Sequence, residues 1–384
     1  MTMAIVVYAH TGESVYDFFF LNHLLKKNRV YLLTFNERKP SMVPTAVQIV
    51  RIPEPFHPTV SPLTGLNEII NSFLRAFFLK RRLNQFKHDL LISCGGQLYG
   101  FYSALSSCSP SILFIWGSDV LVAPKLLPFR FMAKYSLKKA SAVVVDSNVQ
   151  EEACIALGCD PRKIVNFPWV DMQVIKGRSE KTTTDDKGET CELKEKLGWR
   201  ENDPVVISTR HHEPIYNIEC LIHAIPWVIE EAPNARFLIL GKGSLTRKLK
   251  KSAAMLNISS NVKFLGHVPL TEMPKYLKMV DVYVSTSLSD GTSASLIEAM
   301  TCKLPVIVTD IAGNREWITD GSNGLLFPVK DSRLLAERII TLLKDGDRRK
   351  SLSANAFTTV CEKANWQTNS KLLDRLITSL VTLK

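Results

Sequence analysis

The segment that spans residues 282–308 constrains the fold more than any other part of the chain. Residues 282–284 and 306–308 are short apolar runs typical of buried strands. Between them lie a polar turn at Gly291, where glycine permits a sharp bend, and a helical pattern that begins after good N-cap residues. A strand, a helix and a strand in this order predict an α/β unit with parallel strands.

The start of this predicted helix is suited to binding an anion. A helix that begins at the carboxyl end of a parallel strand presents unpaired N–H groups and a positive dipole end to the crevice where phosphate binds. Asp290 precedes the helix, and Glu298 lies inside it, which puts the two carboxylates on the order of 10 Å apart. A retaining glycosidase pair needs about 5 Å. The wider spacing suits two acids that hold hydroxyls at either end of one ligand, with a diphosphate between them.

The same segment resembles the Glu-x7-Glu signature of the family-4 retaining glycosyltransferases, with Asp290 at the first Glu position and Glu298 at the second. The similarity covers most of the C-terminal half of the chain. It continues through residues 298–308, 313–316 and 320–327, and upstream through residues 240–245 and 262–266. The resemblance implies an α/β protein of the GT-B fold, in which two Rossmann-like doubly wound domains face each other across a cleft.

The resemblance also implies the donor-binding residues. In the family the second carboxylate binds the nucleotide ribose, and the first carboxylate binds the donor sugar together with the backbone that follows it. We carry these roles to Glu298 and Asp290. The other expected donor contacts are Gly291, Thr292, Ser293, Ala294 and Ser295 after the first acid, Gly266, His267 and Val268 beside the nucleobase, and His211.

The loop that follows residues 205–208 departs from the family pattern. Relatives commonly have Gly-Arg-Leu there and Lys-Gly a little later, whereas this chain has His211 in the Arg register and Tyr216 in the Lys register. Arg210 stands one position early. We expect Arg210 and Lys242 to bind the diphosphate, because a charged hydrogen bond contributes about 1.5–3 kcal/mol. These cations and the helix amides would stabilise the leaving group, so no metal or further cofactor is expected.

The N-terminal half repeats the order of strand, loop and helix. Its candidate acceptor-side residues are Thr11, Gly12, Gly95 and Gly96, which follow two predicted strands. For Thr11 and Gly12 a tight strand-to-helix turn is an equal alternative.

A second departure from the family lies in the same half. Many relatives carry a His after two of these strands, where this chain has Gly95-Gly96 and Trp116-Gly117. Asp119 is the nearest polar group that could act on the acceptor hydroxyl. The alternative is that Asp119 caps the adjacent turn.

Four segments are expected along the chain. They are an acceptor-binding Rossmann-like domain over residues 1–172, a linker with a polar insertion over 173–202, a nucleotide-sugar-binding domain over 203–363 and a helix over 364–384 that crosses back to the first domain. Residues 176–189 have almost no apolar content, which predicts a mobile insertion.

Composition limits the partners. The chain has 384 residues, a formal net charge of +11 and 8 cysteines without zinc-site spacing, which fits a reducing cytoplasm. No apolar run is long enough to span a bilayer. Two basic, aromatic windows at residues 66–87 and 125–139 could lie on an anionic membrane surface, or they could be ordinary helices with a solvated face. No nucleic-acid signature accompanies the charge. Asp345 and Asp347 are interpreted as turn residues, not as metal ligands.

The resulting hypothesis is a retaining glycosyltransferase that is either free in the cytoplasm or located at the inner face of the membrane. It would move a hexosyl unit from a nucleotide diphosphate sugar to a glycan or lipid-linked acceptor in cell-envelope glycoconjugate synthesis. Two alternatives remain open. One is a sugar-nucleotide-binding scaffold subunit with impaired catalysis, and the other is a sugar-nucleotide epimerase.

Overall fold

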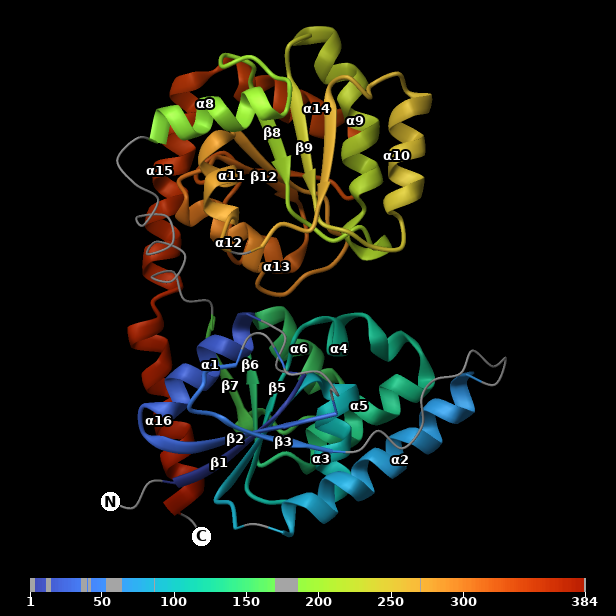
Figure 1. The fold of residues 1–384 in the computed structure, drawn as a ribbon, viewed down its shortest axis with the longest axis vertical. Helices are drawn as coiled ribbons and strands as arrows, with labels where there is room; N and C mark the ends of the chain where they lie inside the picture. The colour runs from blue at the N-terminus through green and yellow to red at the C-terminus, as the bar shows by residue number, and fades with distance from the viewer. Residues whose placement is uncertain are drawn as a thin grey trace. The chain divides into compact units, whose positions relative to one another are not determined.

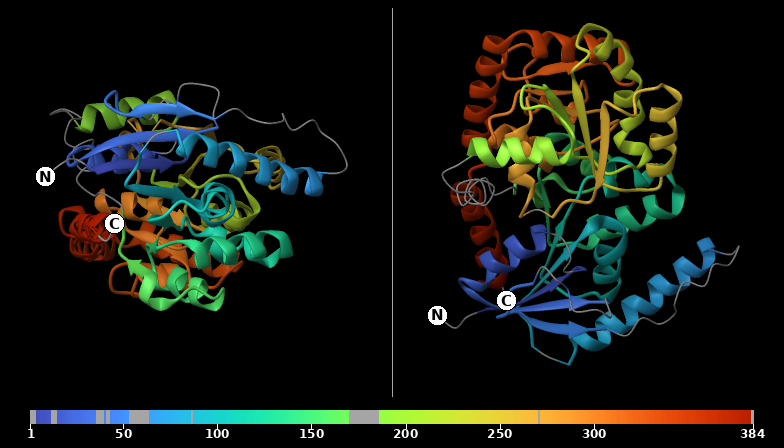
Figure 2. Two further views of the ribbon diagram at one scale, coloured as in Figure 1. Left: turned by 90° about the horizontal axis from the view of Figure 1, so that it is seen from below. Right: turned by 45° about the horizontal axis from the view of Figure 1, so that its top comes forward.

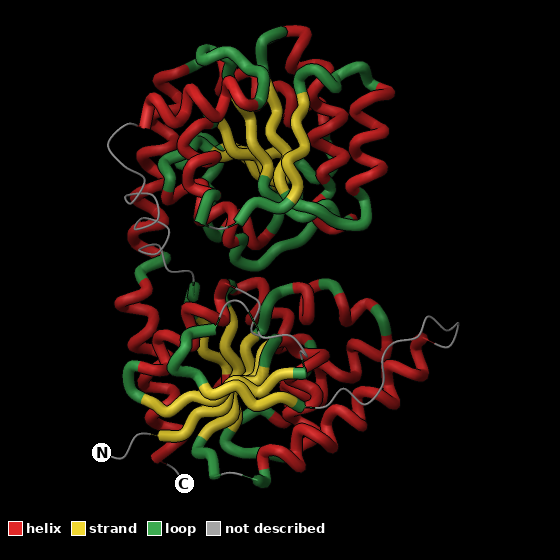
Figure 3. Tube along the Cα trace, viewed as in Figure 1, coloured by secondary structure: helices red, strands yellow, loops and turns green. Residues whose placement is uncertain are grey.

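The structure is a computed structural model. It describes residues 4–11, 15–35, 40, 43–52, 64–85, 87–169, 186–269 and 271–382. The chain divides into two compact units, a first unit of Met1–Trp169 with Gln367–Lys384 and a second unit of Val170–Trp366. Each unit has its own parallel sheet with helices around it, as expected for two Rossmann-like domains of the GT-B fold (Figures 1 and 3).

The first unit is built on a sheet of seven parallel strands in the order β3-β2-β1-β4-β5-β6-β7. The strands are β1 (Ala4–Ala9), β2 (Asn28–Thr34), β3 (Gln48–Arg51), β4 (Leu90–Cys94), β5 (Ser111–Phe114), β6 (Ala142–Val145) and β7 (Ile164–Asn166). The order reverses between β1 and β4, and a doubly wound sheet binds ligands at the carboxyl ends of strands beside such a reversal. The inner strands β4, β5 and β6 are buried along their whole length, as strands covered on both faces must be.

Helices cover both faces of this sheet (Figure 2). They are α1 (Val15–Leu25), α2 (Thr64–Leu83), α3 (Gly100–Ser106), α4 (Ser118–Leu121), α5 (Leu127–Lys139), α6 (Asn148–Ala156) and α16 (Trp366–Thr382), with short turns η1 (Gly95–Tyr99), η2 (Ala123–Lys125) and η3 (Pro161–Lys163). The glycines Gly95 and Gly96 were predicted as a loop, but they begin the π-helical turn η1, which runs directly into α3. Burial of the segment against the sheet and α5 favours a hydrogen-bonded turn over an open loop.

The helix α16 belongs to the first unit although it follows the second unit in the sequence. Asp374 Oδ1 lies 2.8 Å from His23 Nε2, and Asp374 Oδ2 accepts a 2.6 Å bond from Lys27 Nζ. Asn369 donates to the carbonyl of Pro168. These contacts join α16 to the end of α1 and to Pro168, near the end of the N-terminal segment of the first unit.

The second unit is built on six parallel strands in the order β10-β9-β8-β11-β12-β13. The strands are β8 (Val205–Ser208), β9 (Arg236–Leu240), β10 (Val262–Gly266), β11 (Val282–Ser285), β12 (Val306–Thr309) and β13 (Leu325–Phe327). The helices are α8 (Asp186–Lys196), α9 (Ile218–Glu231), α10 (Thr246–Met255), α11 (Met273–Met279), α12 (Ala294–Thr301), α13 (Ala312–Arg315), α14 (Ser332–Lys344) and α15 (Gly346–Lys363), with the turn η4 (Pro214–Tyr216). Here the order reverses between β8 and β11, so the loops after these two strands lie at the expected ligand-binding edge.

One predicted segment needs correction. Residues 186–189 were interpreted as the end of a mobile insertion, but they begin the helix α8. Glu189 pairs with Lys275 of α11 at 2.7 Å, and Lys194 donates to the carbonyls of Glu201 and Asp203. These contacts with the rest of the second unit stabilise a helix that its charged sequence does not favour by itself. Residues 176–185 lie outside the described residues.

Candidate functional site

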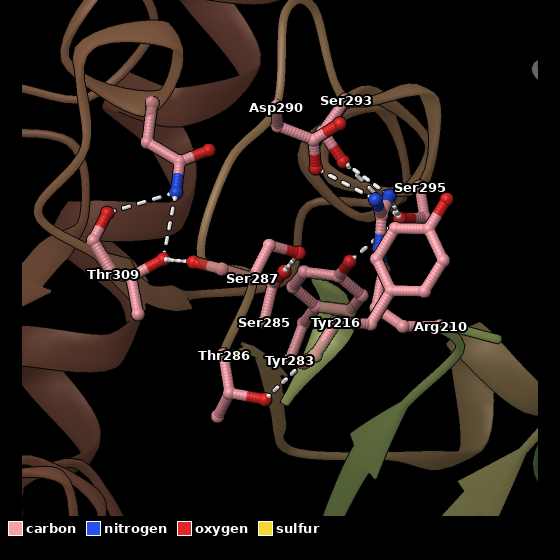
Figure 4. Close-up of polar contacts among 11 residues, drawn as sticks. Arg210, Tyr216, Tyr283, Ser285, Thr286, Ser287, Asp290, Ser293, Ser295 and Thr309 are labelled. Carbon is pink, nitrogen blue, oxygen red and sulfur yellow. Dashed lines mark hydrogen bonds and ion pairs between the residues drawn. The ribbon is translucent and has the colours of Figure 1, made fainter. Parts of the chain in front are cut away.

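Arg210 is the centre of a polar cluster at the ligand-binding edge of the second unit (Figure 4). Its Nη2 lies 2.6 Å from Oδ2 of Asp290, and its Nη1 donates to the hydroxyls of Ser293 at 2.7 Å and Ser295 at 2.9 Å. The side chains of Arg210 and Asp290 are 10% and 17% exposed, respectively. Charge-assisted bonds are stronger where water is largely excluded, so this cluster is held firmly.

An aromatic ring holds Arg210 from the other side. The guanidinium carbon lies 4.2 Å from the ring centroid of Tyr216, the distance of a cation–π contact. Tyr216 ends the turn η4, and its carbonyl accepts a 2.8 Å hydrogen bond from the hydroxyl of Thr286 after β11. The residue that stands in the Lys register of the family therefore stacks on the arginine, an interaction that the planar guanidinium favours.

Tyr283 of β11 is part of the cluster, and the sequence analysis treated it only as a strand residue. Its hydroxyl donates to the hydroxyl of Ser295 at 2.8 Å. Burial raises the pKa of Tyr283, against the opposing charge of Arg210, so the phenol keeps its proton. The available signal was a tyrosine within an aliphatic buried strand, because a buried phenol needs a hydrogen-bond partner.

The loop that carries Asp290 is packed tightly. A Cβ added at Gly313 would collide with the carbonyl oxygens of Asp290 and Gly291, so only a glycine at this position allows the start of α13 to lie so close to the loop. The hydroxyl of Thr309 donates to the carbonyl of Ser287 at 2.6 Å (Figure 4). Burial raises the pKa of the Asp290 carboxyl, and the Arg210 charge opposes that rise.

The predicted second cation, Lys242, lies on the neighbouring loop. Its side chain is exposed, and its Cε would lie 2.7 Å from a Cβ added at Gly266. Nδ1 of His211 lies 3.3 Å from the carbonyl of Lys242. The loop is held against the one after β8, because a Cβ at Gly243 would come within 2.5 Å of the carbonyl oxygen of His212. The structure thus brings together Lys242, Gly266 and His211, which the sequence analysis had assigned separately.

The other predicted donor residues lie just before α12, along it, and after β10. Thr292 accepts a 3.3 Å hydrogen bond from the indole of Trp317. Glu298 is half-buried on α12; burial raises the pKa of the nearby Cys302 thiol to about 12, and the charge of Glu298 adds to the rise. The remaining three are Ala294, which is half-buried, His267, which is exposed, and Val268, which is buried.

In the first unit, Asp119 holds two loops together. Its carboxylate accepts hydrogen bonds from the backbone amides of Gly96 at 2.7 Å and Trp116 at 3.1 Å, and Gln97 donates to its carbonyl. Burial raises the pKa of Asp119, and these amides oppose the rise. The contacts support the capping alternative, and an action of Asp119 on an acceptor stays a prediction. Of the two candidates after β1, Thr11 accepts from Thr34 Oγ1 through its carbonyl, and Gly12 lies outside the described residues.

Sequence reasoning missed His10, the residue directly after β1. Its Nδ1 lies 2.6 Å from Oδ1 of Asp17, which also accepts a 2.8 Å bond from the hydroxyl of Tyr8. Its ring stacks on Trp116, with the centroids 5.3 Å apart and the planes 12° apart. The available signal was a His at the carboxyl end of the first parallel strand, with an Asp in the first turn of the following helix.

Asp345 lies between α14 and α15, as predicted for a turn residue, whereas Asp347 lies in the first turn of α15. Asp345 accepts from the amide of Arg348 as the N-cap of α15, and Asp347 is fully exposed to solvent. Within the described ranges, no group of three or more His, Cys, Asp or Glu residues is placed to hold a metal ion. The expectation that no metal or cofactor is needed stays a prediction.

Comparisons with known proteins agree with this geometry. The sequence profile described as "Glycosyl transferases group 1" matches residues 189–359, and the profile "Glycosyl transferase 4-like" matches residues 6–147. Two Rossmann-like units with a polar site at the reversal of the second sheet define a protein of the GT-B class. The chain belongs to the group 1 glycosyltransferases.

Individual relatives are similar over part or all of the chain. The GDP-mannose-dependent monoacylated alpha-(1-6)-phosphatidylinositol monomannoside mannosyltransferase of Corynebacterium glutamicum is 29% identical over 204 residues, 51% of this chain and 52% of that protein. The chain spans about half the length of the curated relatives it matches.

Two solved structures share the whole fold. Anabaena HepE in complex with UDP and glucose has a TM-score of 0.75 at 16% identity, covering 98% of this chain and 100% of that one. WaaG, a glycosyltransferase involved in lipopolysaccharide biosynthesis, has a TM-score of 0.74 at 15% identity, covering 96% and 98%. At these identities the similarity establishes the fold alone.

Proposed function

We propose that this protein transfers a hexosyl unit from a nucleotide diphosphate sugar to a hydroxyl of a glycan or lipid-linked acceptor, with retention of the anomeric configuration. The observation that carries the proposal is the cluster of Arg210, Asp290, Ser293 and Ser295 at the start of α12. It lies within the segment that the group 1 profile matches. A nucleotide-sugar donor is also supported by a GDP-mannose-dependent relative and by HepE, which was solved with UDP and glucose.

The cluster has the parts that a diphosphate leaving group requires. As the bond from the sugar to the diphosphate breaks, negative charge develops on the departing oxygen, and groups held in position stabilise it best. Arg210 is held at the start of α12 by two serines and by the ring of Tyr216. Lys242 is an exposed cation on the adjacent loop. In this proposal Asp290 orients the sugar hydroxyls and Glu298 binds the ribose.

Asp290 neutralises Arg210 in the structure, which sets a condition on donor binding. A diphosphate competes with one carboxylate for the guanidinium, and it offers more charge and more acceptor oxygens. Donor binding would then shift Arg210 from Asp290 to the phosphates. The released carboxylate would be available to the sugar hydroxyls.

Thermal-shift measurements with UDP-, GDP- and ADP-sugars test the donor assignment, because a ligand that binds the native state raises the melting temperature. Glu298→Ala should abolish the shift produced by the best donor. Glu337→Ala on α14, where the side chain is exposed, is the matched control and should retain it. A normal shift with Glu298→Ala would refute the ribose assignment.

Product analysis separates the two alternatives. An epimerase converts its nucleotide sugar without an acceptor, whereas a transferase releases the nucleotide faster when an acceptor hydroxyl is supplied. A scaffold subunit would bind the donor without hydrolysing it. Slow release of nucleotide by the purified chain would therefore argue against the scaffold.

We also propose that the protein works in the cytoplasm, at the inner face of the membrane, in cell-envelope glycoconjugate synthesis. The two basic windows form α2 and α5, which both pack on α3. Phe73 of α2 and Phe131 of α5 are 53% and 61% exposed, and the ring of each lies 6.3 Å from that of Phe101 in α3. Exposed aromatic rings beside lysines and arginines suit an anionic lipid interface. Among the described helices, none is both long and apolar enough to cross a bilayer.

Vesicle flotation tests this surface. The protein should bind vesicles of phosphatidylcholine with phosphatidylglycerol more strongly than vesicles of phosphatidylcholine alone. Phe73→Ser with Phe131→Ser should weaken this binding, and Met255→Ser, a change at an exposed apolar residue of α10, should not. Equal binding by all variants would contradict the proposed surface.

A further inference from the structure

A second group of residues in the first unit has the geometry of a ligand site. Asp17 is fully buried in the first turn of α1. Its Oδ1 accepts a hydrogen bond from the hydroxyl of Tyr8 and lies within hydrogen-bonding distance of Nδ1 of His10. A carboxylate only accepts hydrogen bonds, so Nδ1 of His10 carries the proton. In the neutral ring the other nitrogen, Nε2, is then left as an acceptor.

The ring of His10 is held from several sides. It stacks on Trp116, and the ring of Tyr99 lies 5.8 Å from it at a 56° tilt. The amide of Trp116 is in turn bound by Asp119. The side chain of His10 remains 16% exposed, and within the described part of the chain Nε2 has no hydrogen-bond partner. One edge of a fixed imidazole is thus open to a ligand.

The His10 ring lies at the carboxyl edge of the first sheet. His10 directly follows β1, and Trp116 follows β5; the strand between these two in the sheet is β4. Both residues therefore lie at the carboxyl edge of the sheet, at the strand-order reversal where doubly wound sheets bind ligands. The chain has no His at position 116, and the ring that occupies this position contacts an imidazole that comes from the end of β1.

We propose that His10 is a positioning residue for the acceptor, whose hydroxyl donates a hydrogen bond to Nε2 while Asp17 holds the ring in the required tautomer. This inference rests on the proposed transferase function. The ligand is of the alcohol or sugar class, because Nε2 accepts one hydrogen bond and the surrounding rings Tyr99 and Trp116 provide an apolar setting.

Kinetics of the transfer reaction test this proposal, because the KM for the acceptor and the KM for the donor should respond differently. The donor is the nucleotide sugar with the largest thermal shift, and the acceptors are the octyl glycosides of glucose, mannose and N-acetylglucosamine. His10→Ala should raise the KM for the acceptor by about tenfold, as expected for one lost hydrogen bond. The KM for the donor and the nucleotide released without acceptor should be unchanged. His10→Gln keeps an acceptor atom and should recover part of the loss.

The control is His223→Ala at a half-exposed position of α9, which should leave both KM values unchanged. An unchanged acceptor KM in His10→Ala would overturn the proposal, as would an equal loss of donor affinity. So would a wild-type protein that binds and hydrolyses the donor while none of the three octyl glycosides accelerates nucleotide release. If the wild-type protein binds no nucleotide sugar at all, the proposed function itself fails.

A spectroscopic measurement tests the tautomer without any substrate. Nitrogen NMR of protein labelled with ¹⁵N-histidine, with the His10 signals assigned from their absence in His10→Gln, reports which ring nitrogen carries the proton. Nδ1 should be protonated and Nε2 unprotonated in the neutral ring, and Asp17→Asn should weaken this preference. A proton on Nε2 in the neutral wild-type ring would contradict the proposal.

Discussion

Replacing Arg210 by methionine removes the central group of the second-unit site while keeping an unbranched apolar stem. The change deletes the ion pair with Asp290, the two hydrogen bonds to serines and the stack on Tyr216. The Asp290 carboxylate is left largely buried without its partner. Breaking one side of a buried pair costs about 3–5 kcal/mol. Because both side chains keep some exposure, we expect the low end, about 3 kcal/mol at neutral pH.

The cost should depend on pH with a definite sign. Burial already raises the pKa of Asp290, and removing Arg210 removes the charge that opposes this rise. The folded variant then binds a proton more readily than the unfolded chain, whose Asp has a pKa of about 3.9. Its stability should therefore rise as pH falls towards that value. The difference in unfolding free energy between Arg210→Met and the wild type should therefore decrease from pH 7 to pH 5.

Urea denaturation of the full chain measures this, with two optical probes because a protein of two units can unfold in more than one transition. Asp290→Asn is combined with Arg210→Met so that no unpaired carboxylate remains. The double variant should be more stable than Arg210→Met alone. Arg333→Met, which removes an exposed partner of Glu337, is the control and should cost no more than about 1 kcal/mol. If Arg210→Met matched this control, or if the double variant gained nothing, the reasoning would be refuted.

Three further changes test other parts of the structure. Burial raises the pKa of Asp203, but hydrogen bonds, chiefly from Arg236, outweigh burial and leave this pKa lowered. The stabilisation that Asp203 provides is therefore present above about pH 4 and is lost as the pH falls. Asp203→Asn should flatten the acid side of a plot of urea midpoint against pH, and an unchanged slope would contradict this. Gly243→Ala places a Cβ 2.5 Å from the carbonyl oxygen of His212 and should cost about 1–3 kcal/mol of unfolding free energy, seen as a lower melting temperature; an unchanged melting temperature would show that the two loops move apart without cost. Asp374→Asn weakens the contacts between α16 and α1 and should speed hydrogen exchange in α16, whereas unchanged exchange would show that these contacts contribute little.

The fold class was predictable because local patterns agree with the tertiary structure. The apolar runs at residues 282–284 and 306–308 are strands, and the helix between them begins at Ala294 after the N-cap Ser293. Where the local pattern and the tertiary packing disagree, the prediction from sequence was wrong. The charged residues 186–189 form part of α8 because they pack on α11, and Gly95 begins a π-helical turn because its surroundings are buried.

The candidate site was predictable only where its residues are close in the sequence. Asp290, Ser293 and Ser295 were named because they lie around one helix start, and Arg210 because of its register after β8. The stack of Tyr216 on Arg210 depends on the course of η4, which no periodicity specifies. The contact of His10 with Trp116 joins two strands across the sheet. Such contacts depend on tertiary structure, and a single sequence does not record them.

The two-part makeup of the first unit has a consequence for biosynthesis. Residues 170–366 leave the ribosome before α16 does, a delay of roughly 10–40 s at about 5–20 residues per second. During this interval the nascent first unit lacks the helix that contacts His23 and Lys27, whereas by its end every strand of the second unit has been synthesised. The later half of the protein can therefore mature before the earlier half, and a chaperone that shields the exposed side of α1 would be needed most in that window.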